Sequence, residues 1–302
     1  MSVARLALAA GMLMTCSVAG AAQYAIIVAG LGGVEQYEQR FREQAETIAQ
    51  AARKSSEDAA NVVVLTGNDA RRDALRREML ALGKRMSESD AVTIVLIGHG
   101  SFDGDQYRFN VPGPDLTGGE LGRMFDQLPA RQQLIVNTSS ASGAVIEQWR
   151  RPQRVIVAAT KSGGERTATR FAQHWAQAVS TDAADVNKDD IVTAAEAFEY
   201  ANREVVAAFK ADVALATEHA RMEGEQTERF AVARLGTAGI GSSDPEVNAL
   251  FAQRGTIERD LDAVKQRKPS LSEDEYYDTL EGVLVKLALL QRQIDAKQAM
   301  PQ

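Results

Sequence analysis

The sequence predicts an α/β protein whose mainly parallel sheet is flanked by helices and followed by a C-terminal α-helical hairpin. Short apolar runs alternate with amphipathic segments along residues 23–211. This alternation is typical of βαβ units, whose strands pair in parallel. The chain has 302 residues, of which 45% are hydrophobic and 25% charged. Such a composition indicates a globular protein with one sizeable core and an appendage.

Five apolar runs predict the strands of the sheet. Each run is followed by a segment rich in glycine, serine or threonine, as expected where a buried strand turns. The runs cover residues 24–31, 61–66, 91–97, 133–137 and 154–159, and amphipathic helices are expected over 35–54, 70–87, 166–179 and 193–211. Ligands of parallel sheets bind at the carboxyl ends of the strands. Here those ends carry Gly32, His99, Ser140 and Thr160.

Residues 245–302 predict a hairpin of two helices. Two charged helical segments, 247–267 and 272–297, meet at a Lys-Pro-Ser turn. An apolar stripe on the second segment allows the hairpin to pack on the domain or to pair with a partner as a coiled coil. The stripe consists of Leu280, Val283, Leu284, Leu287 and Leu290.

Residues 212–244 connect the domain to the hairpin and show no clear periodicity, so no secondary structure is predicted there. The segment contains an adjacent acid and imidazole, Glu218 and His219. A lone pair of this kind is more typical of a surface than of a metal site. We therefore expect these two residues on the surface.

Residues 1–22 are typical of a signal peptide. Arg5 supplies a positive charge, residues 6–18 are mainly apolar, and small residues follow, so that cleavage is expected after Ala21 or Ala22. The apolar stretch is shorter than the ~20 residues that a membrane span needs. The sequence therefore predicts a periplasmic or secreted bacterial protein with no membrane span after cleavage. The alternative is an uncleaved N-terminal anchor.

Cysteine usage and charge exclude several classes of site. Cys16 is the only cysteine and lies within the predicted signal peptide. The mature chain would then contain no disulfide, no thiolate metal site and no cysteine nucleophile. A lipoprotein would use Cys16, but Thr15 stands where a glycine or alanine is expected. The net charge of -7 argues against a broad nucleic-acid-binding face.

One predicted strand ends in Gly98-His99-Gly100, and the next ends in Thr138-Ser139-Ser140-Ala141-Ser142-Gly143. These two strand ends resemble the legumain/caspase clan of peptidases, which includes the C13 legumains. In that clan a His-Gly pair ends one strand and a nucleophilic cysteine follows the next, trailed in legumains by Glu-Ser-Gly. The resemblance covers roughly residues 24–210 and implies a caspase-like fold. It places His99 at the catalytic histidine and Ser140 at the cysteine, with the backbone amides of Gly100 and Ser140 forming an oxyanion hole.

The chain departs from that pattern at three positions. Gly32 stands where legumains carry an asparagine, and Ser140 replaces the cysteine. Glu38 aligns with a substrate-binding arginine, although Arg40 is near. These departures predict that the peptidase chemistry has been lost and that the domain is a pseudoenzyme.

Ser140 could instead be a nucleophile with His99 as its general base. A serine hydroxyl needs a base within hydrogen-bond reach and usually a third group that orients the base. Asp103 and Asp105, in the loop after His99, are the candidates for that third group. A competing interpretation is that the serines of this segment cap a helix beginning near Gly143.

Residues 185–196 match the spacing of an EF-hand calcium loop, with oxygen-bearing side chains at positions 1, 3, 5, 9 and 12. The predicted Ca²⁺ ligands are Asp185, Asn187, Asp189, Thr193 and Glu196, with the backbone carbonyl of Ile191. Three features depart from the pattern: Asp190 stands in place of the turn glycine, Ala197 follows the last ligand, and no partner EF-hand is present. The alternative is an acidic turn in which Thr193 or Asp190 caps the next helix.

These observations favour an exported, non-catalytic caspase/legumain-like domain that holds one Ca²⁺ and serves in binding or scaffolding. Its partner would be an unidentified protein or peptide. The first alternative is a hydrolase or peptidase that uses Ser140 and His99. The second is a calcium-responsive adaptor in which helix order around residues 166–210 depends on Ca²⁺.

Overall fold

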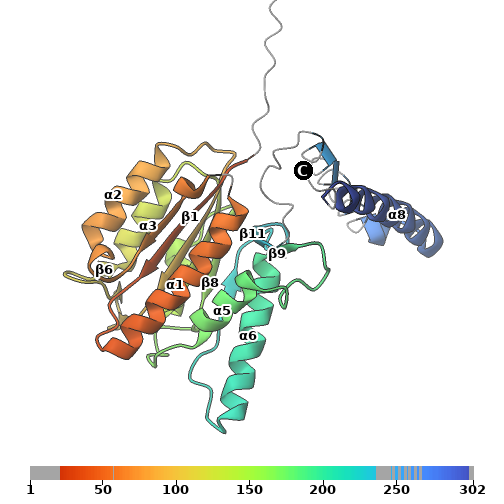
Figure 1. The fold of residues 1–302 in the computed structure, drawn as a ribbon. Helices are drawn as coiled ribbons and strands as arrows, with labels where there is room; N and C mark the ends of the chain where they lie inside the picture. The colour runs from red at the N-terminus through yellow and green to blue at the C-terminus, as the bar shows by residue number, and fades with distance from the viewer. Residues whose placement is uncertain are drawn as a thin grey trace, which may run out of the picture.

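The fold is built on a mainly parallel sheet, as predicted from the five apolar runs (Figure 1). The computed structural model describes residues 21–56, 58–235 and 267–298, with scattered positions between 246 and 266. In this part of the chain the sheet has six strands in the order β10-β8-β7-β3-β1-β2. The parallel strands are β1 (Gln23–Ala29), β2 (Val62–Leu65), β3 (Ala91–Ile97), β7 (Gln132–Asn137) and β8 (Arg154–Ala158), and β10 (Arg221–Glu223) is an antiparallel edge strand.

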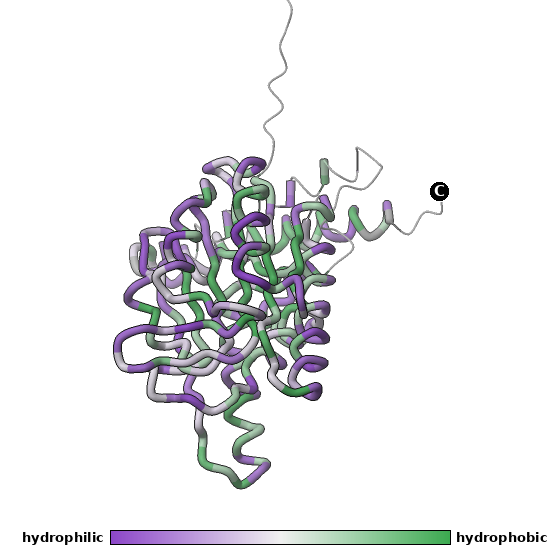
Figure 2. The backbone as a smooth tube through the Cα atoms, turned by 90° about the vertical axis from the view of Figure 1, so that its left-hand side faces the viewer, coloured by the Kyte–Doolittle hydropathy of each residue, from purple (hydrophilic) through white to green (hydrophobic). Residues whose placement is uncertain are grey.

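Helices cover both faces of the sheet and bury one apolar core on each side. The first face carries α1 (Glu35–Ser55), α5 (Phe171–Ser180) and α6 (Ala194–Ala211), and the second carries α2 (Arg72–Gly83), α3 (Gly118–Asp126) and α4 (Ile146–Trp149). Alternate residues of β1 serve the two cores: Ile27 lies in the first and Ile26 in the second, both fully buried. Figure 2 shows hydrophobic strands inside and hydrophilic turns of helix outside. The predicted α/β class with helices on the sheet is confirmed.

Several short strands had no counterpart in the sequence prediction. A small antiparallel sheet follows β3 and consists of β4 (Gly100–Phe102), β5 (Tyr107–Phe109) and β6 (Leu116–Thr117). A second pair joins β9 (Ile191–Thr193) to β11 (Ala231–Arg234). The segment 212–235, to which no structure was assigned, therefore supplies both β10 and β11. β10 and β11 span three and four residues, which are too few to show a period.

The C-terminal region contains α8 (Glu273–Gln298), which Ser272 and Glu275 cap by exchanging backbone and side-chain hydrogen bonds. Val264 packs against Tyr276 and Val283 of α8, as a helical hairpin requires. The predicted signal peptide up to residue 20, the linker 236–245 and much of the first hairpin helix lie outside the described residues. Short 3₁₀ turns complete the fold at η1 (Ala59–Asn61), η2 (Gly67–Asp69), η3 (Ser142–Val145) and η5 (Lys268–Ser270). Within the described residues, no helix is long and apolar enough to cross a membrane.

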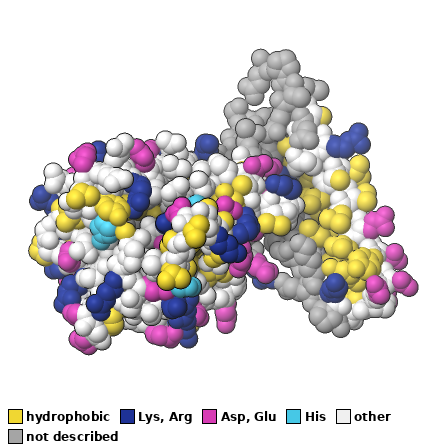
Figure 3. Space-filling model, turned by 90° about the horizontal axis from the view of Figure 1, so that it is seen from below, with side chains coloured by type: hydrophobic (Ala, Val, Ile, Leu, Met, Phe, Trp, Pro, Cys, Tyr) yellow, Lys and Arg dark blue, Asp and Glu magenta, His cyan; other side chains and the backbone are white. Residues whose placement is uncertain are grey.

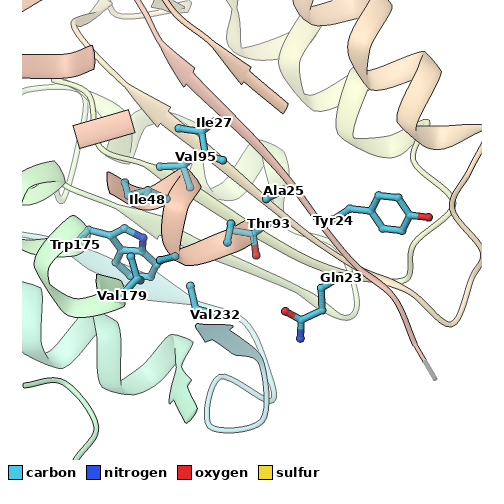
Figure 4. A pocket seen from close by; sticks show the side chains of 12 residues that line it. Gln23, Tyr24, Ala25, Ile27, Ile48, Thr93, Val95, Trp175, Val179 and Val232 are labelled. Carbon is cyan, nitrogen blue, oxygen red and sulfur yellow. The ribbon is translucent and has the colours of Figure 1, made fainter. Parts of the chain in front are cut away.

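A small cavity lies between α1, α5 and the amino-terminal half of the sheet (Figure 4). Ile27, Ile48, Val95 and Trp175 line it, and its volume is about 20 Å³. The Trp175 indole N–H is buried there without a hydrogen-bond partner among the described residues. A cavity of this size holds a water molecule, which could accept that hydrogen bond. The cavity is therefore a packing feature, remote from the carboxyl ends of the strands.

Candidate functional site at the carboxyl ends of the strands

The ends of β3 and β7 bring the two predicted motifs together. The strands are parallel neighbours, and the Thr138 N–H continues the ladder to the Leu96 carbonyl at 2.9 Å. A Cβ on Gly100 would lie 2.5 Å from the Ser140 carbonyl oxygen, so only glycine fits there. We call His99, Gly100, Ser139 and Ser140 the strand-end cluster. Figure 3 views this end of the molecule and shows histidine side chains at the surface among hydrophobic and charged ones.

His99 packs against α1 and makes no hydrogen bond to Ser140. Its ring lies edge-on to Tyr37 and Phe41, with centroid distances of 4.8 and 5.3 Å. Burial lowers the pKa of the imidazole below its ordinary value of 6.5, the Gly32 backbone opposes this, and the Arg40 guanidinium adds to it. His99 is therefore mainly neutral at pH 7. Across the described chain no hydrogen bond joins its ring to the Ser140 hydroxyl, so base and nucleophile are not coupled here.

The expected third group is also engaged elsewhere. The Asp103 carboxylate accepts hydrogen bonds from the backbone N–H groups of Asp105 and Gln106 and from the Arg108 guanidinium. The Gln106 N–H is the largest cause of the lowered pKa of Asp103, followed by Arg108. Asp103 thus closes the turn between β4 and β5. The prediction that it orients His99 is wrong, because its oxygens satisfy the turn.

Arg40, rather than Glu38, reaches the rings around His99. Its guanidinium lies 4.6 Å from the Tyr37 ring centroid, a cation–π distance. The Arg40 Nε atom is buried and has no hydrogen-bond partner within the described residues. Glu38 instead accepts a hydrogen bond from the Gly32 N–H at 2.7 Å. A Cβ at position 32 would lie 2.5 Å from the Glu38 nitrogen, which explains why no asparagine stands there.

A buried polar network beneath Ser140 was not foreseen from the sequence. The Tyr107 hydroxyl lies 2.6 Å from the Ser139 hydroxyl, which donates to the Asn137 side-chain oxygen at 2.8 Å. The Asn137 amide donates back to Tyr107 at 3.0 Å. Burial raises the pKa of Tyr107 to about 12, so it stays protonated. The Ser139 hydroxyl also lies 3.2 Å from the Ser140 carbonyl oxygen, so this network packs directly against the backbone that presents Ser140.

The backbone at Ser140 forms a tight turn. Ala141 has φ 58°, in the left-handed region that costs energy for a residue with a Cβ. Its N–H donates to the Glu165 carbonyl at 2.7 Å. The Ser140 N–H makes no hydrogen bond to any described residue, and the residue is 3% exposed. The Ser140 N–H is therefore a buried donor that no described residue uses.

The capping interpretation of the serines is wrong. A 3₁₀ turn, η3, precedes the short helix α4, and neither has a side-chain cap. Ser142 instead lies 3.2 Å from the Thr160 hydroxyl, and Thr160 accepts from the Gly143 N–H at 2.9 Å. These bonds join the ends of β7 and β8. The serines serve tertiary contacts because no regular helix begins at this point.

Glu218 is buried near the same end of the sheet, contrary to the surface position expected for it. It is 4% exposed and accepts the Arg170 N–H at 2.6 Å, at the start of α5. Its other carboxyl oxygen has no partner among the described residues. Burial raises the pKa of Glu218 to about 7, against the opposing backbone N–H groups of Arg170 and Phe171. This burial was not predictable from the sequence, because Glu218 and His219 are two polar residues in a segment without periodicity.

His219 lies over the loop that follows β8. Its Nδ1 atom is 2.5 Å from the Glu165 carboxylate, which also accepts the Lys161 N–H at 2.8 Å. Burial opposes ionisation of Glu165, but hydrogen bonds from His219 and Lys161 lower its pKa overall. Glu165 and His219 thereby link the β8 loop to the segment before β10. Together with the strand-end cluster they line the carboxyl edge of β7 and β8.

In the predicted calcium loop, residues 185–196, side chains accept hydrogen bonds from backbone N–H groups of the same loop. Asp185 is 2% exposed and accepts the backbone N–H groups of Asp189 at 3.2 Å and Asp190 at 3.0 Å. Asn187 accepts from the Asp189 N–H at 3.0 Å. Asp190 has φ 63°, the left-handed conformation that favours glycine at this position. The loop therefore takes the sharp turn even with aspartate there.

The remaining predicted ligands lie at the end of the loop. Thr193 and Glu196 form a capping box at the start of α6, and Ile191 donates its N–H to Asp189 at 2.9 Å. Burial raises the pKa of Asp189, as do the charges of Asp185 and Glu196. Acidic groups are therefore concentrated here. Within the described chain, however, no three His, Cys, Asp or Glu side chains are arranged to hold a metal ion.

A second strand and an arginine complete the surroundings of the loop. β9 pairs with β11, which gives the loop the antiparallel partner that the missing second EF-hand would have supplied. Val192 in β9 is fully buried in the first core. The Arg254 guanidinium donates to the Asp189 carbonyl and lies 4.0 Å from the Asp190 carboxylate. The C-terminal region thus contacts the acidic loop.

Comparison with known proteins gives fold neighbours only. No protein-family model matches the chain, and no curated protein matches its sequence. One similar solved structure is protein GSU0716 from Geobacter sulfurreducens, with 11% identity and a TM-score of 0.46 over 74% of this chain and 96% of that one. Another is the Drosophila initiator caspase Dronc, with 8% identity and a TM-score of 0.43 over 73% of this chain and 84% of the caspase.

Proposed function

We propose that this chain is an exported, non-catalytic caspase/legumain-like domain that binds a protein or peptide partner at the strand-end cluster. The observation that carries the proposal is the packing of His99 against Tyr37 and Phe41, without a hydrogen bond to Ser140. A serine nucleophile needs such a bond because its hydroxyl is neither as acidic nor as nucleophilic as a thiol. Asp103 is committed to its own turn, and among the described residues no hydrogen bond joins the Asp105 carboxylate to His99, so neither candidate for the third group orients the imidazole.

The cluster retains features that suit binding. The Ser140 N–H and the buried Arg40 Nε are donors without a hydrogen-bond partner among the described residues, and exposed Leu31 follows β1 at the same edge of the sheet. Extended peptides are commonly recognised by backbone hydrogen bonds combined with apolar contacts. A peptide bound without cleavage uses these groups and leaves His99 in its aromatic packing.

A hydrolase that uses Ser140 and His99 is the second candidate. Two observations support it: Ala141 has a left-handed φ of 58°, and the adjacent Ser140 N–H has no hydrogen-bond partner among the described residues. Strained turns are concentrated at functional sites. This candidate requires His99 to leave the Tyr37 ring and approach Ser140.

Labelling with a fluorophosphonate probe, read by peptide mass spectrometry, separates the two candidates. The pseudoenzyme proposal predicts no adduct on Ser140 in folded protein. A Ser140 adduct that disappears in His99→Ala but persists in Ser142→Ala would establish the hydrolase instead. Ser142 is the matched control because it lies two residues away and contacts Thr160 rather than His99.

We further propose that the loop 185–196 binds one Ca²⁺ through Asp185, Asn187, Asp189, Thr193, Glu196 and the Ile191 carbonyl. Hard oxygen donors in this number suit Ca²⁺. In support, burial raises the pKa of Asp189, the charges of Asp185 and Glu196 add to that rise, and a divalent cation would relieve the repulsion. Because the carboxylates now bond to the loop and to the α6 cap, binding must reorient side chains. Calorimetric titration should show Ca²⁺ binding that Asp185→Asn weakens and Asp182→Asn leaves unchanged.

Export is also a proposal, supported by the sequence of residues 1–22. If it holds, the protein recovered from the periplasm or medium begins at Ala22 or Gln23. N-terminal sequencing checks this directly. An intact N-terminus on the exported protein would support the anchor alternative.

A further inference from the structure

The outer face of α8 carries an apolar patch that is exposed among the described residues. Tyr276, Val283 and Leu290 are buried on the inner face. Four large apolar side chains are exposed on the opposite side: Tyr277 (52%), Leu284 (44%), Val285 (50%) and Leu289 (53%). Figure 3 shows hydrophobic side chains gathered over this region, with acidic ones beside them. An apolar patch rimmed by charged residues is typical of an interaction surface.

The outer face has the spacing of a helix–helix seam. Residues 274, 278, 281, 285, 288 and 292 follow one another at intervals of four and three. This alternation keeps side chains on one side of a helix and is the a/d pattern of paired helices. The seam residues are Asp274, Asp278, Glu281, Val285, Ala288 and Arg292. The seam is therefore acidic in its first half, apolar in its middle and basic at its end.

This order of charges makes the face complementary to itself when reversed. Two copies of α8 that run antiparallel and cross at Val285 place Asp278 of each beside Arg292 of the other. In the same arrangement the apolar middles meet. Neither Asp278 nor Arg292 has an ion-pair partner among the described residues. A parallel pair would instead set acid against acid, which is unfavourable.

Gly282 is a second, independent sign of a close neighbour. It lies inside α8, where glycine costs about 0.5–1 kcal/mol relative to alanine. A Cβ there would meet nothing within 4 Å, so packing against the described part of the chain does not require glycine. It lies one turn from Asp278 and Val285, beside the seam. A missing side chain at this point lets another helix approach closely.

We propose that a second copy of this chain docks on the outer face of α8, forming an antiparallel, two-fold symmetric dimer centred on Val285. A two-fold interface uses the same patch twice, and the charge order of α8 fits that symmetry. The proposal is independent of what the strand-end cluster does. The dimer would place two cluster-bearing domains on one helical connector.

Sedimentation of the full chain over a concentration series tests the dimer. The wild-type chain should dimerise, and Val285→Asp should raise the dissociation constant at least about tenfold by burying an unpaired charge. The matched control is Val206→Asp on α6, where the valine is also exposed (43%) but lies off the patch. A wild-type chain that stays monomeric, including one that binds lipid vesicles as a monomer, would overturn the proposal. So would a dimer that Val285→Asp leaves unchanged.

Charge reversal tests the pairing. Asp278→Arg alone and Arg292→Asp alone should each weaken self-association, because each sets like charges together. Mixing these two variants should restore a heterodimer, since every cross-pair is again of opposite sign. Failure of the mixture to associate, with both variants folded, would contradict the antiparallel register.

Disulfide cross-linking tests the orientation independently, in a Cys16→Ser background. Val285→Cys should cross-link to its own copy at the two-fold axis. Tyr277→Cys should not, because two copies of residue 277 would lie about 24 Å apart along an antiparallel pair at 1.5 Å per residue. Equal cross-linking at both positions would indicate a parallel pair and overturn the proposal.

Discussion

The strand-end cluster and the loop 185–196 were both predicted from short motifs, but only the loop has the local conformation that its motif needs. In the loop, Asp185 already bonds the backbone across the turn, and Asp190 adopts the left-handed conformation that the motif needs. In the cluster, the backbones meet but His99 turns to α1. Residue spacing within one short loop constrains where its side chains lie. Whether two side chains from different strands meet depends also on their rotamers and on the residues packed around them.

The largest effect on stability is expected at Gly100, where the ends of β3 and β7 are in contact. Gly100→Ala should destabilise the fold by about 3 kcal/mol, because the new Cβ overlaps the Ser140 carbonyl at 2.5 Å and the Ser139 hydroxyl at 2.7 Å. Urea unfolding measures the change. Gly119→Ala is the control, since the nearest atom to its Cβ would lie 3.5 Å away. Equal stability of both variants would show that the two strand ends are not in contact.

Glu218 offers the next largest effect, and it depends on pH. The folded state holds this proton up to about pH 7, whereas an ordinary glutamate releases it near 4.5. Between these pH values the folded state therefore binds more protons at Glu218 than the unfolded state does. The contribution of Glu218 to the free energy of unfolding falls as pH rises through that window. Through Glu218, the free energy of unfolding of the wild-type chain should fall by about 2–3 kcal/mol between pH 4.5 and 7, and this fall should be absent in Glu218→Gln.

The control for that pH profile is Glu199→Gln, an exposed glutamate on α6. It should leave the pH dependence of unfolding unchanged. If Glu218→Gln kept the wild-type profile, the buried carboxyl would not be the group that titrates.

The smallest effect on stability is expected in the loop 185–196, where Asp190 has a left-handed backbone conformation. Asp190→Gly should stabilise the calcium-free protein by about 1 kcal/mol, because glycine adopts φ 63° without strain. The loss of the 4.0 Å contact with Arg254 offsets part of the gain. Lys188→Gly is the comparison, since Lys188 also has a positive φ, 58°. Destabilisation by Asp190→Gly would show that the Asp190 side chain matters more to the loop than its backbone conformation.

The strong periodic elements were predictable from the sequence, and the short polar ones were not. β1, β3 and β8 are continuous apolar runs buried on both faces, so their hydrophobicity alone marks them. β10 is a three-residue strand, Arg221–Glu223, and its polar–apolar–polar order is too short to distinguish a strand from a loop. It forms because the edge of β8 offers unpaired backbone groups.

The candidate site was predictable in its residues but not in its contacts. The sequence placed His99 and Ser140 at neighbouring strand ends, because carboxyl ends of parallel strands share one edge. It did not place Arg40 beside His99, since that contact depends on how α1 packs. Nor did it indicate the Tyr107–Ser139 contact, which joins residues 32 positions apart.

The central claim is that His99 belongs to the aromatic packing of α1 and is not coupled to Ser140. NMR titration of the His99 imidazole in the wild-type chain and in Ser140→Ala tests it most directly. A midpoint below 6.5 is expected in both proteins, with no difference between them. Arg40→Gln should raise the midpoint, because it removes a nearby positive charge. A midpoint that shifts when the Ser140 hydroxyl is removed would show that His99 and Ser140 are coupled.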